Sequence, residues 1–317
     1  MKSPFFSCLL GACLALGTPQ AAAEPQYHDA AGRFLDVWQR HQDSMPFERM
    51  LAMRDDLLLP FGDYYGERVA QMTNPGRTLR LTLESFAERQ AAFELAYRQL
   101  KGTLPLAISE FANAFADFQP CIPVWLVHSL TGANGQVLLL GGEPSLVLGV
   151  DMVAESHDWL DQRPFLHHEL VHLYRLQQGL ALPLAESPTP LLTALWEEGL
   201  ATYVAQRLNP GASLASLMLE QPLGLSRKAE LQLAQLAANL YAYLGSDQSA
   251  DYERYFLLDQ GDLPRAGYYL GYRVVSHLGK AFSLDELMAM KPEQYRPLVE
   301  QSLFALAKQA RWLVVSR

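Results

Sequence analysis

The segment FLHHELVHLYRL, residues 165–176, combines helical spacing with apolar side chains on nearly every side. A helix that is apolar all round is buried, so the chain has to fold around this segment on several sides. The same segment carries three histidines and a glutamate, and buried imidazoles and carboxylates need partners. The fold therefore has to supply partners in its interior, and a bound metal ion is one such partner.

The composition is that of a globular protein. Half of the 317 residues are hydrophobic and 19% are charged, which is enough apolar material for a sizeable core. The net charge of −9, without clusters of Lys and Arg, argues against a nucleic-acid partner. After the N-terminal region no apolar run is long enough to cross a bilayer, so we expect no transmembrane segment in the mature chain.

The N-terminus has the features of an export signal. An apolar run over residues 5–16 is followed by the small residues Ala21 and Ala23, which form a cleavage site that a signal peptidase accepts. We therefore expect residues 1–23 to be removed and the protein to be periplasmic or secreted. The alternative is a lipid-anchored envelope protein, because the motif LGAC that ends at Cys13 is similar to a bacterial lipobox.

Cleavage after residue 23 would leave Cys121 as the only cysteine. The mature chain then has no internal disulfide, even in an oxidising compartment, and its stability comes from core packing or from a bound ion. Because it precedes Ile122 and Pro123, we expect Cys121 to be a small core residue rather than a nucleophile.

The apolar periodicity predicts an α+β protein that is predominantly α. Residues 24–118 have helical spacing with punctuation near Gly102, residues 119–208 combine short β-rich runs with two helices, and residues 209–317 are helical again. We expect the β-rich runs to form a small sheet of hairpins or a meander. These runs are CIPVWLVHSL, GQVLLLGG and SLVLGVDMV.

His168, Glu169 and His172 have the spacing HExxH. Residues four apart on an α-helix lie one turn apart and about 40° around the axis, so both imidazoles can bind one ion. Glu169 lies about 100° from His168, where it can reach a water on the ion without binding the ion itself. His167 also lies about 100° from His168, and we expect it either to support the site or to be structural. The alternative, a half-exposed helix with solvated histidines, is disfavoured by the apolar neighbours.

Catalytic zinc sites usually take three protein ligands, and the run WEEGLATY at residues 196–203 offers the third. With this run the sequence resembles the gluzincin metallopeptidases, whose third ligand is a glutamate on a helix after HExxH. The aminopeptidase N branch has a similar W-x-N-E-G-F-A-[ST]-Y, and glycyl aminopeptidases have E-G-F-T-S-Y. The resemblance implies that Glu198 is the third ligand. We expect Glu197 to be an ordinary surface acid at a helix N-terminus, where the helix dipole favours it.

The resemblance covers roughly residues 165–205 and departs from aminopeptidase N in two ways. The connection from His172 to Glu198 is longer, with 25 residues between them, and the sequence lacks the G-x-M-E-N stretch that binds the free amino group of the substrate. It therefore does not imply an exopeptidase. A looser likeness, which includes the run RAGYYLGYR at residues 265–273, is to bacterial predicted zinc-dependent peptidases of undefined substrate.

The resemblance implies a zincin-like catalytic unit, with one Zn²⁺ per chain held by two histidines and a glutamate and with Glu169 as the general base. It also implies a tyrosine that stabilises the oxyanion, for which Tyr268 and Tyr272 are the candidates because they share a helical face, whereas Tyr269 points away from them. Thr202 could support a metal-bound imidazole or simply pack in the core. Arg265 and Arg273 could bind a peptide carbonyl or carboxylate or be ordinary surface arginines.

These features predict an exported zinc metallopeptidase that acts on a peptide or protein substrate. Zincins commonly hold an extended substrate along a sheet edge, and either GQVLLLGG or SLVLGVDMV could be that edge. Two alternatives remain open: a zinc amidase that acts on peptidoglycan-type peptides, and a non-catalytic zinc- or peptide-binding envelope protein. A closed fourth coordination position would favour the non-catalytic protein, but no second cysteine or other obvious fourth ligand lies near the site.

Overall fold

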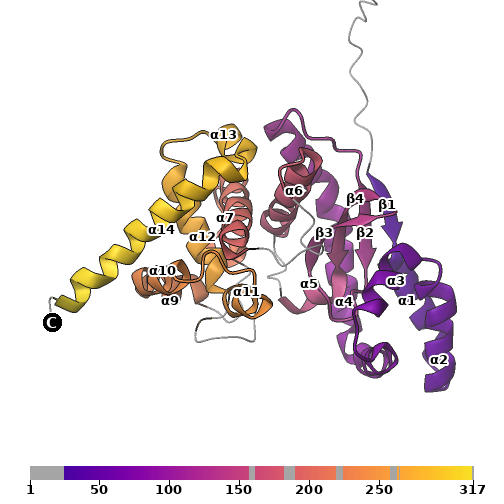
Figure 1. Ribbon diagram of the computed structural model, residues 1–317. Helices are drawn as coiled ribbons and strands as arrows, with labels where there is room; N and C mark the ends of the chain where they lie inside the picture. Colours follow the sequence, from indigo (N-terminus) through magenta and orange to yellow (C-terminus); the bar gives the residue numbers. More distant parts are fainter. Residues whose placement is uncertain are drawn as a thin grey trace, which may run out of the picture.

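The computed structural model describes residues 25–156, 161–181, 190–218, 224–257, 263 and 265–315. Helices predominate and the strands form one small mixed sheet (Figure 1), so the predicted α+β class, mostly α, is confirmed. The expected export signal and the alternative lipid anchor lie outside the described residues. Among the described helices, none is both long and apolar enough to cross a membrane.

The sheet has four strands in the order β1-β2-β4-β3. Their bounds are β1 (Gln26–Asp29), β2 (Pro123–Val127), β3 (Gly135–Leu140) and β4 (Glu143–Gly149). The first two pairings, β1 with β2 and β2 with β4, are parallel, and only β3 and β4 form an antiparallel hairpin. The expected hairpin is therefore confirmed for β3 and β4, whereas a meander is wrong.

Burial explains the strand order. Strand β4 is buried along its last five residues and lies inside the sheet, whereas β3 is buried only at Val137 and Leu140 and lies at the edge. Strand β1 lies in a region that was predicted to be helical, so the prediction is wrong there. The sequence QYHD has no strand periodicity of its own, and the strand forms because it pairs with β2. Cys121 is exposed, so the expected core position is wrong; the neighbouring Ile122 is buried instead.

The longest helix, α4 (Pro75–Ala114), begins at the N-cap Asn74 and runs through both Gly102 and Pro105. Punctuation at Gly102 does not end it, because an apolar stripe continues past this point and is buried against the core. The other helical segments before the sheet hairpin are α1 (Ala30–His41), α2 (Pro46–Met53), the short π-helix η1 (Arg54–Leu58) and α3 (Gly62–Ala70).

Helix α6 (Arg163–Gln177) lies between the sheet and the C-terminal helices (Figure 1). It packs against α4, β3 and β4 on one side and against α7 (Leu191–Leu208) on the other. The remaining helices are α5 (Val150–Ser156), α8 (Leu214–Leu217), α9 (Leu225–Leu231), α10 (Leu233–Tyr241), α11 (Ser249–Phe256), α12 (Ala266–Leu278), α13 (Leu284–Ala289) and α14 (Pro292–Val315).

Two glycines bring α12 close to α7. A β-carbon on Gly199 of α7 would lie 2.3 Å from the carbonyl carbon of Gly271 on α12, so the two backbones touch where these residues meet. This close approach brings the tyrosine-rich start of α12 toward the helix that carries Glu198.

Candidate metal centre

The candidate metal centre is built on α6, whose side chains are buried from Pro164 to Arg175. Pro164 lies in the first turn, where proline is favoured, and Gly179, with a φ of +65°, follows the end of the helix. Apolar residues cover the helix on several sides, and the two histidines of the motif, His168 and His172, are each only 9% exposed. The chain therefore holds these polar side chains inside the fold.

Three side chains from α6 and α7 converge on one point. The Nε2 atoms of His168 and His172 lie 3.1 Å apart, and Oε2 of Glu198 lies 3.1 Å and 3.6 Å from them. Zinc bonds of 2.0 to 2.1 Å in a tetrahedron put neighbouring ligand atoms about 3.3 Å apart. The spacing of these two nitrogens and one oxygen therefore fits a metal ion, and among the described residues no other group of at least three His, Cys, Asp or Glu side chains does so.

The charges of the cluster support this interpretation. Burial raises the pKa of Glu198, but His172 and the contact with His168 outweigh burial and hold that pKa well below its usual value. Burial likewise lowers the pKa of His172, and the Glu198 carboxylate outweighs it and raises this pKa to about 9. Glu198 is therefore ionised at neutral pH, and its negative charge favours a cation between it and the two imidazoles.

Thr202 of α7 lies beside the ring nitrogen of His168 that faces away from Glu198. The hydroxyl of Thr202 donates to the carbonyl oxygen of Glu198 at 2.8 Å and lies 3.5 Å from Nδ1 of His168. A metal-bound imidazole usually has such a partner on its other nitrogen. Thr202 thus lies where the sequence suggested a supporting residue.

Glu169 lies beside the three ligands but outside their cluster. Its carboxylate packs against the backbone of Gly135 at the start of β3, where a β-carbon would lie 2.4 Å from Cδ of Glu169. Burial raises the pKa of Glu169, although His168 and His172 oppose this effect. A carboxyl group with a raised pKa next to the metal ligands is suited to accept and return a proton. Any side chain at position 135 would force the Glu169 carboxylate to move, a requirement that the motif alone does not reveal.

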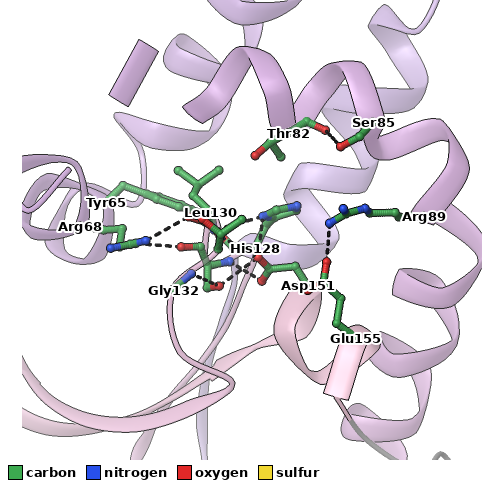
Figure 2. Close-up of polar contacts among 12 residues, drawn as sticks. Tyr65, Arg68, Thr82, Ser85, Arg89, His128, Leu130, Gly132, Asp151 and Glu155 are labelled. Carbon is green, nitrogen blue, oxygen red and sulfur yellow. Dashed lines mark hydrogen bonds and ion pairs between the residues drawn. The ribbon is translucent and has the colours of Figure 1, made fainter. Parts of the chain in front are cut away.

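The loop that leads from β2 to Gly135 is held in a strained conformation. Leu130 and Thr131 have φ angles of +53° and +60°, which non-glycine residues rarely adopt. Figure 2 shows how Asp151, at the start of α5, meets this loop: its carboxylate accepts hydrogen bonds from the backbone N–H groups of Ser129 at 2.6 Å and Thr131 at 3.1 Å.

The other side of the loop is held by α3. The Arg68 side chain donates to the carbonyl oxygens of Ser129 and Leu130 at 2.9 and 3.0 Å (Figure 2). The hydroxyl of Tyr65 donates to the carbonyl oxygen of His128 at 3.1 Å. These bonds fix the backbone that carries Gly135 to Glu169. None of these supporting residues belongs to a recognisable motif.

The ligands open onto a cavity of about 490 Å³. One wall is the start of β3, from Gly135 to Leu138, and the other is formed by α11 and the start of α12. Strand β3 lies at one edge of the sheet, so the cavity lies along the edge supplied by GQVLLLGG, and SLVLGVDMV supplies the interior strand β4.

The candidate tyrosines divide between two environments. Tyr268 lines the cavity with its ring centroid 6.3 Å from that of His168, and burial together with the charge of Glu198 raises its pKa well above the usual value. Tyr272 is not among the residues that line the cavity, and its ring lies against Tyr269. The hydroxyl of Tyr269 donates to Glu230.

Arg265 and Tyr252 line the same wall of the cavity as Tyr268. The guanidinium carbon of Arg265 lies 4.7 Å from the ring centroid of Tyr268. Tyr252 of α11 also lines the cavity, and burial and the charge of Glu198 raise its pKa. Tyr252 was not predicted from the sequence, because a tyrosine in a short amphipathic helix carries no signal of its own. Arg273 lies outside the cavity, where it pairs with Glu230.

Two neighbours of the ligands are also buried. Glu197 is 4% exposed and forms an ion pair with Arg175, so the expectation of an ordinary surface acid is wrong. It lies in the second turn of α7, inside the protein and away from the helix N-terminus. His167 faces away from the ligands: its Nδ1 lies 2.8 Å from the amide nitrogen of Asn209 and its Nε2 lies 3.4 Å from Glu110.

The geometry shows a group of two histidines and a glutamate that could hold a metal ion, beside a third carboxyl group and a cavity. No protein-family model, curated protein or solved structure matches the chain. The function therefore has to be argued from the site.

Proposed function

We propose that the protein is an exported zinc-dependent metallopeptidase of the gluzincin type. One observation carries the proposal: His168, His172 and Glu198 converge at ligand spacing, and Glu169 lies beside them on the same cavity. The likeness of HExxH and WEEGLATY to the gluzincin pattern supports zinc as the ion. The leader-like residues 1–23 support export.

When bound there, zinc would supply a Lewis acid that polarises a peptide carbonyl and lowers the pKa of a water molecule. Glu169 would accept a proton from the attacking water, which its raised pKa favours, and would pass it to the departing amine. Tyr268 keeps its proton at neutral pH and can donate a hydrogen bond to the carbonyl oxygen as negative charge develops on it.

The edge strand β3 suits an extended substrate. Its first four residues line the cavity, and on its outer side no described strand pairs with it. A peptide that adds to this edge would run past Glu169 and the metal ligands. We therefore propose a peptide or protein as the substrate.

The proposal is tested by measuring zinc content and peptide cleavage on the same purified samples. Wild type is expected to hold one zinc ion per chain and to cut a peptide library. His172→Ala should lose the ion, and Glu169→Gln should keep it while its kcat falls by at least about 100-fold, because a proton acceptor is lost. His277→Ala is the control, since this exposed histidine of α12 lies outside the cavity.

The same samples separate the alternatives. A wild type that holds zinc and cuts peptidoglycan stem peptides but no protein-derived peptide is the zinc amidase. A wild type that holds zinc and cuts neither substrate is the non-catalytic envelope protein. If no sample holds stoichiometric metal, the metallopeptidase proposal is wrong.

A further inference from the structure

A buried ion pair joins α6 and α7 next to the proposed metal ligands. Arg175 is completely buried, and its Nε and Nη2 donate to the two carboxylate oxygens of Glu197 at 2.8 and 2.9 Å. Arg175 follows His172 by three residues, and Glu197 immediately precedes Glu198. The pair therefore joins the two ligand-bearing helices within one turn of the ligands on each side.

The guanidinium also contacts two further segments, α13 and the residues that follow α6. Its Nη1 donates to the carbonyl oxygen of Met288 at 2.7 Å and to that of Met290 at 3.3 Å, and Nη2 contacts the carbonyl oxygen of Leu180 at 3.5 Å. All the donor atoms of Arg175 thus have acceptors. The position of Arg175 is determined from several directions, as Glu197, α13 and the end of α6 all contact it.

Such a pair is a poor source of stability. Removing both charges from water costs nearly as much free energy as their attraction returns, and apolar replacements of similar volume are often equally stable. A forked, two-bond contact does fix geometry, because it resists both sliding and rotation of the two groups. Its location beside the ligands points to a geometric role.

We propose that Arg175 and Glu197 are positioning residues that fix how far α7 is shifted along the axis of α6. They thereby keep the Glu198 carboxylate close enough to the imidazoles of His168 and His172 for all three to bind one ion. This inference rests on the proposed metal site. A shift of α7 by a fraction of a turn would carry Glu198 away from His168 and His172, which lie only 3.1 and 3.6 Å from it. The ion would then lose one of its three protein ligands.

The test compares zinc affinity with stability in the full chain. Zinc dissociation constants are measured by competition with a chelator, and the unfolding of the metal-free protein is measured in urea. In the double variant Arg175→Met/Glu197→Leu, zinc should bind 10- to 100-fold more weakly, the range found when residues behind metal ligands are changed, while the urea midpoint stays near that of wild type. Arg175→Lys keeps the charge but loses the fork and should also weaken zinc binding.

The matched control is Arg80→Gln/Glu84→Gln, which removes an exposed ion pair on α4 and should leave the zinc dissociation constant unchanged. The proposal is overturned if the folded double variant or folded Arg175→Lys binds zinc within about twofold of wild type, or if neither variant folds, since the pair is then structural. A wild type without zinc refutes the metal site itself and is recognised before any variant is compared.

Discussion

The absence of a side chain at Gly135 determines where the Glu169 carboxylate can lie. Gly135→Ala would place a methyl group 2.4 Å from Cδ of Glu169, so the carboxylate has to move. A displacement of about 1 Å of a reacting group costs on the order of 100-fold in rate. We expect Gly135→Ala to retain zinc and to lose about that factor in kcat. Gly102→Ala is the control, because a β-carbon there meets nothing within 4 Å; equal kcat values for the two variants would contradict the prediction.

The two candidate tyrosines can be separated by matched substitutions. Tyr268 lines the cavity and Tyr272 does not, so Tyr268→Phe should lower kcat by about 100- to 1000-fold, the usual cost of losing an oxyanion donor. Tyr272→Phe should have little effect. Steady-state kinetics on one peptide measure both. A larger loss for Tyr272→Phe would remove Tyr268 from the proposed mechanism.

Individual residues differ in how much the sequence says about them. The motif HExxH could be found because its spacing is local and is fixed by helix geometry. Glu198 was identified only through the resemblance of WEEGLATY to the gluzincin pattern. Glu197 was misjudged because its burial depends on Arg175, which lies 22 residues earlier in the chain. Gly135 and Asp151 could not be assigned at all, since their roles arise only when the β2–β3 loop meets α5 and α6.

Among the elements, those set by local pattern could be predicted and those set by tertiary pairing could not. Helix α6 and the β3–β4 hairpin follow from apolar spacing, a first-turn proline and glycines near their ends. Strand β1 has no local signal and depends on β2, which lies about a hundred residues later. Helix α4 passes its glycine and proline because burial of its apolar face outweighs their weak helix propensity.

For the whole molecule, a buried histidine predicts loss of stability in mild acid. His128 is packed among Phe34, Phe86 and Phe93. Burial lowers the pKa of His128 below 6.5. The nearby charges of Asp151 and Glu155 act to raise this pKa and that of Arg89 acts to lower it, but the effect of burial is the largest. As the pH falls through 6.5, the unfolded chain takes up a proton that the folded protein does not. The stability present above pH 6.5 is therefore lost below it, by up to about 1.4 kcal/mol per pH unit until the folded pKa is reached.

Urea unfolding between pH 7.5 and 5.5 measures this effect. Wild type should lose stability more steeply than His128→Phe, which has no proton to take up at this position. The baselines at pH 7.5 differ because the variant also loses the acceptor for the N–H of Leu130, so the slopes are compared. Equal slopes would show that His128 does not contribute to acid sensitivity.

The placement of the ligands also bears on the order in which the site assembles. His168, His172 and Glu198 come from two neighbouring helices within one short stretch of chain, so only a modest loop has to close before they meet. The wall against Glu169 instead comes from the sheet, and the sheet requires strands from distant parts of the chain. Local contacts generally form before distant ones. The group that could hold a metal ion is thus able to form earlier in folding than the wall that faces Glu169, because it depends on fewer contacts between distant parts of the chain.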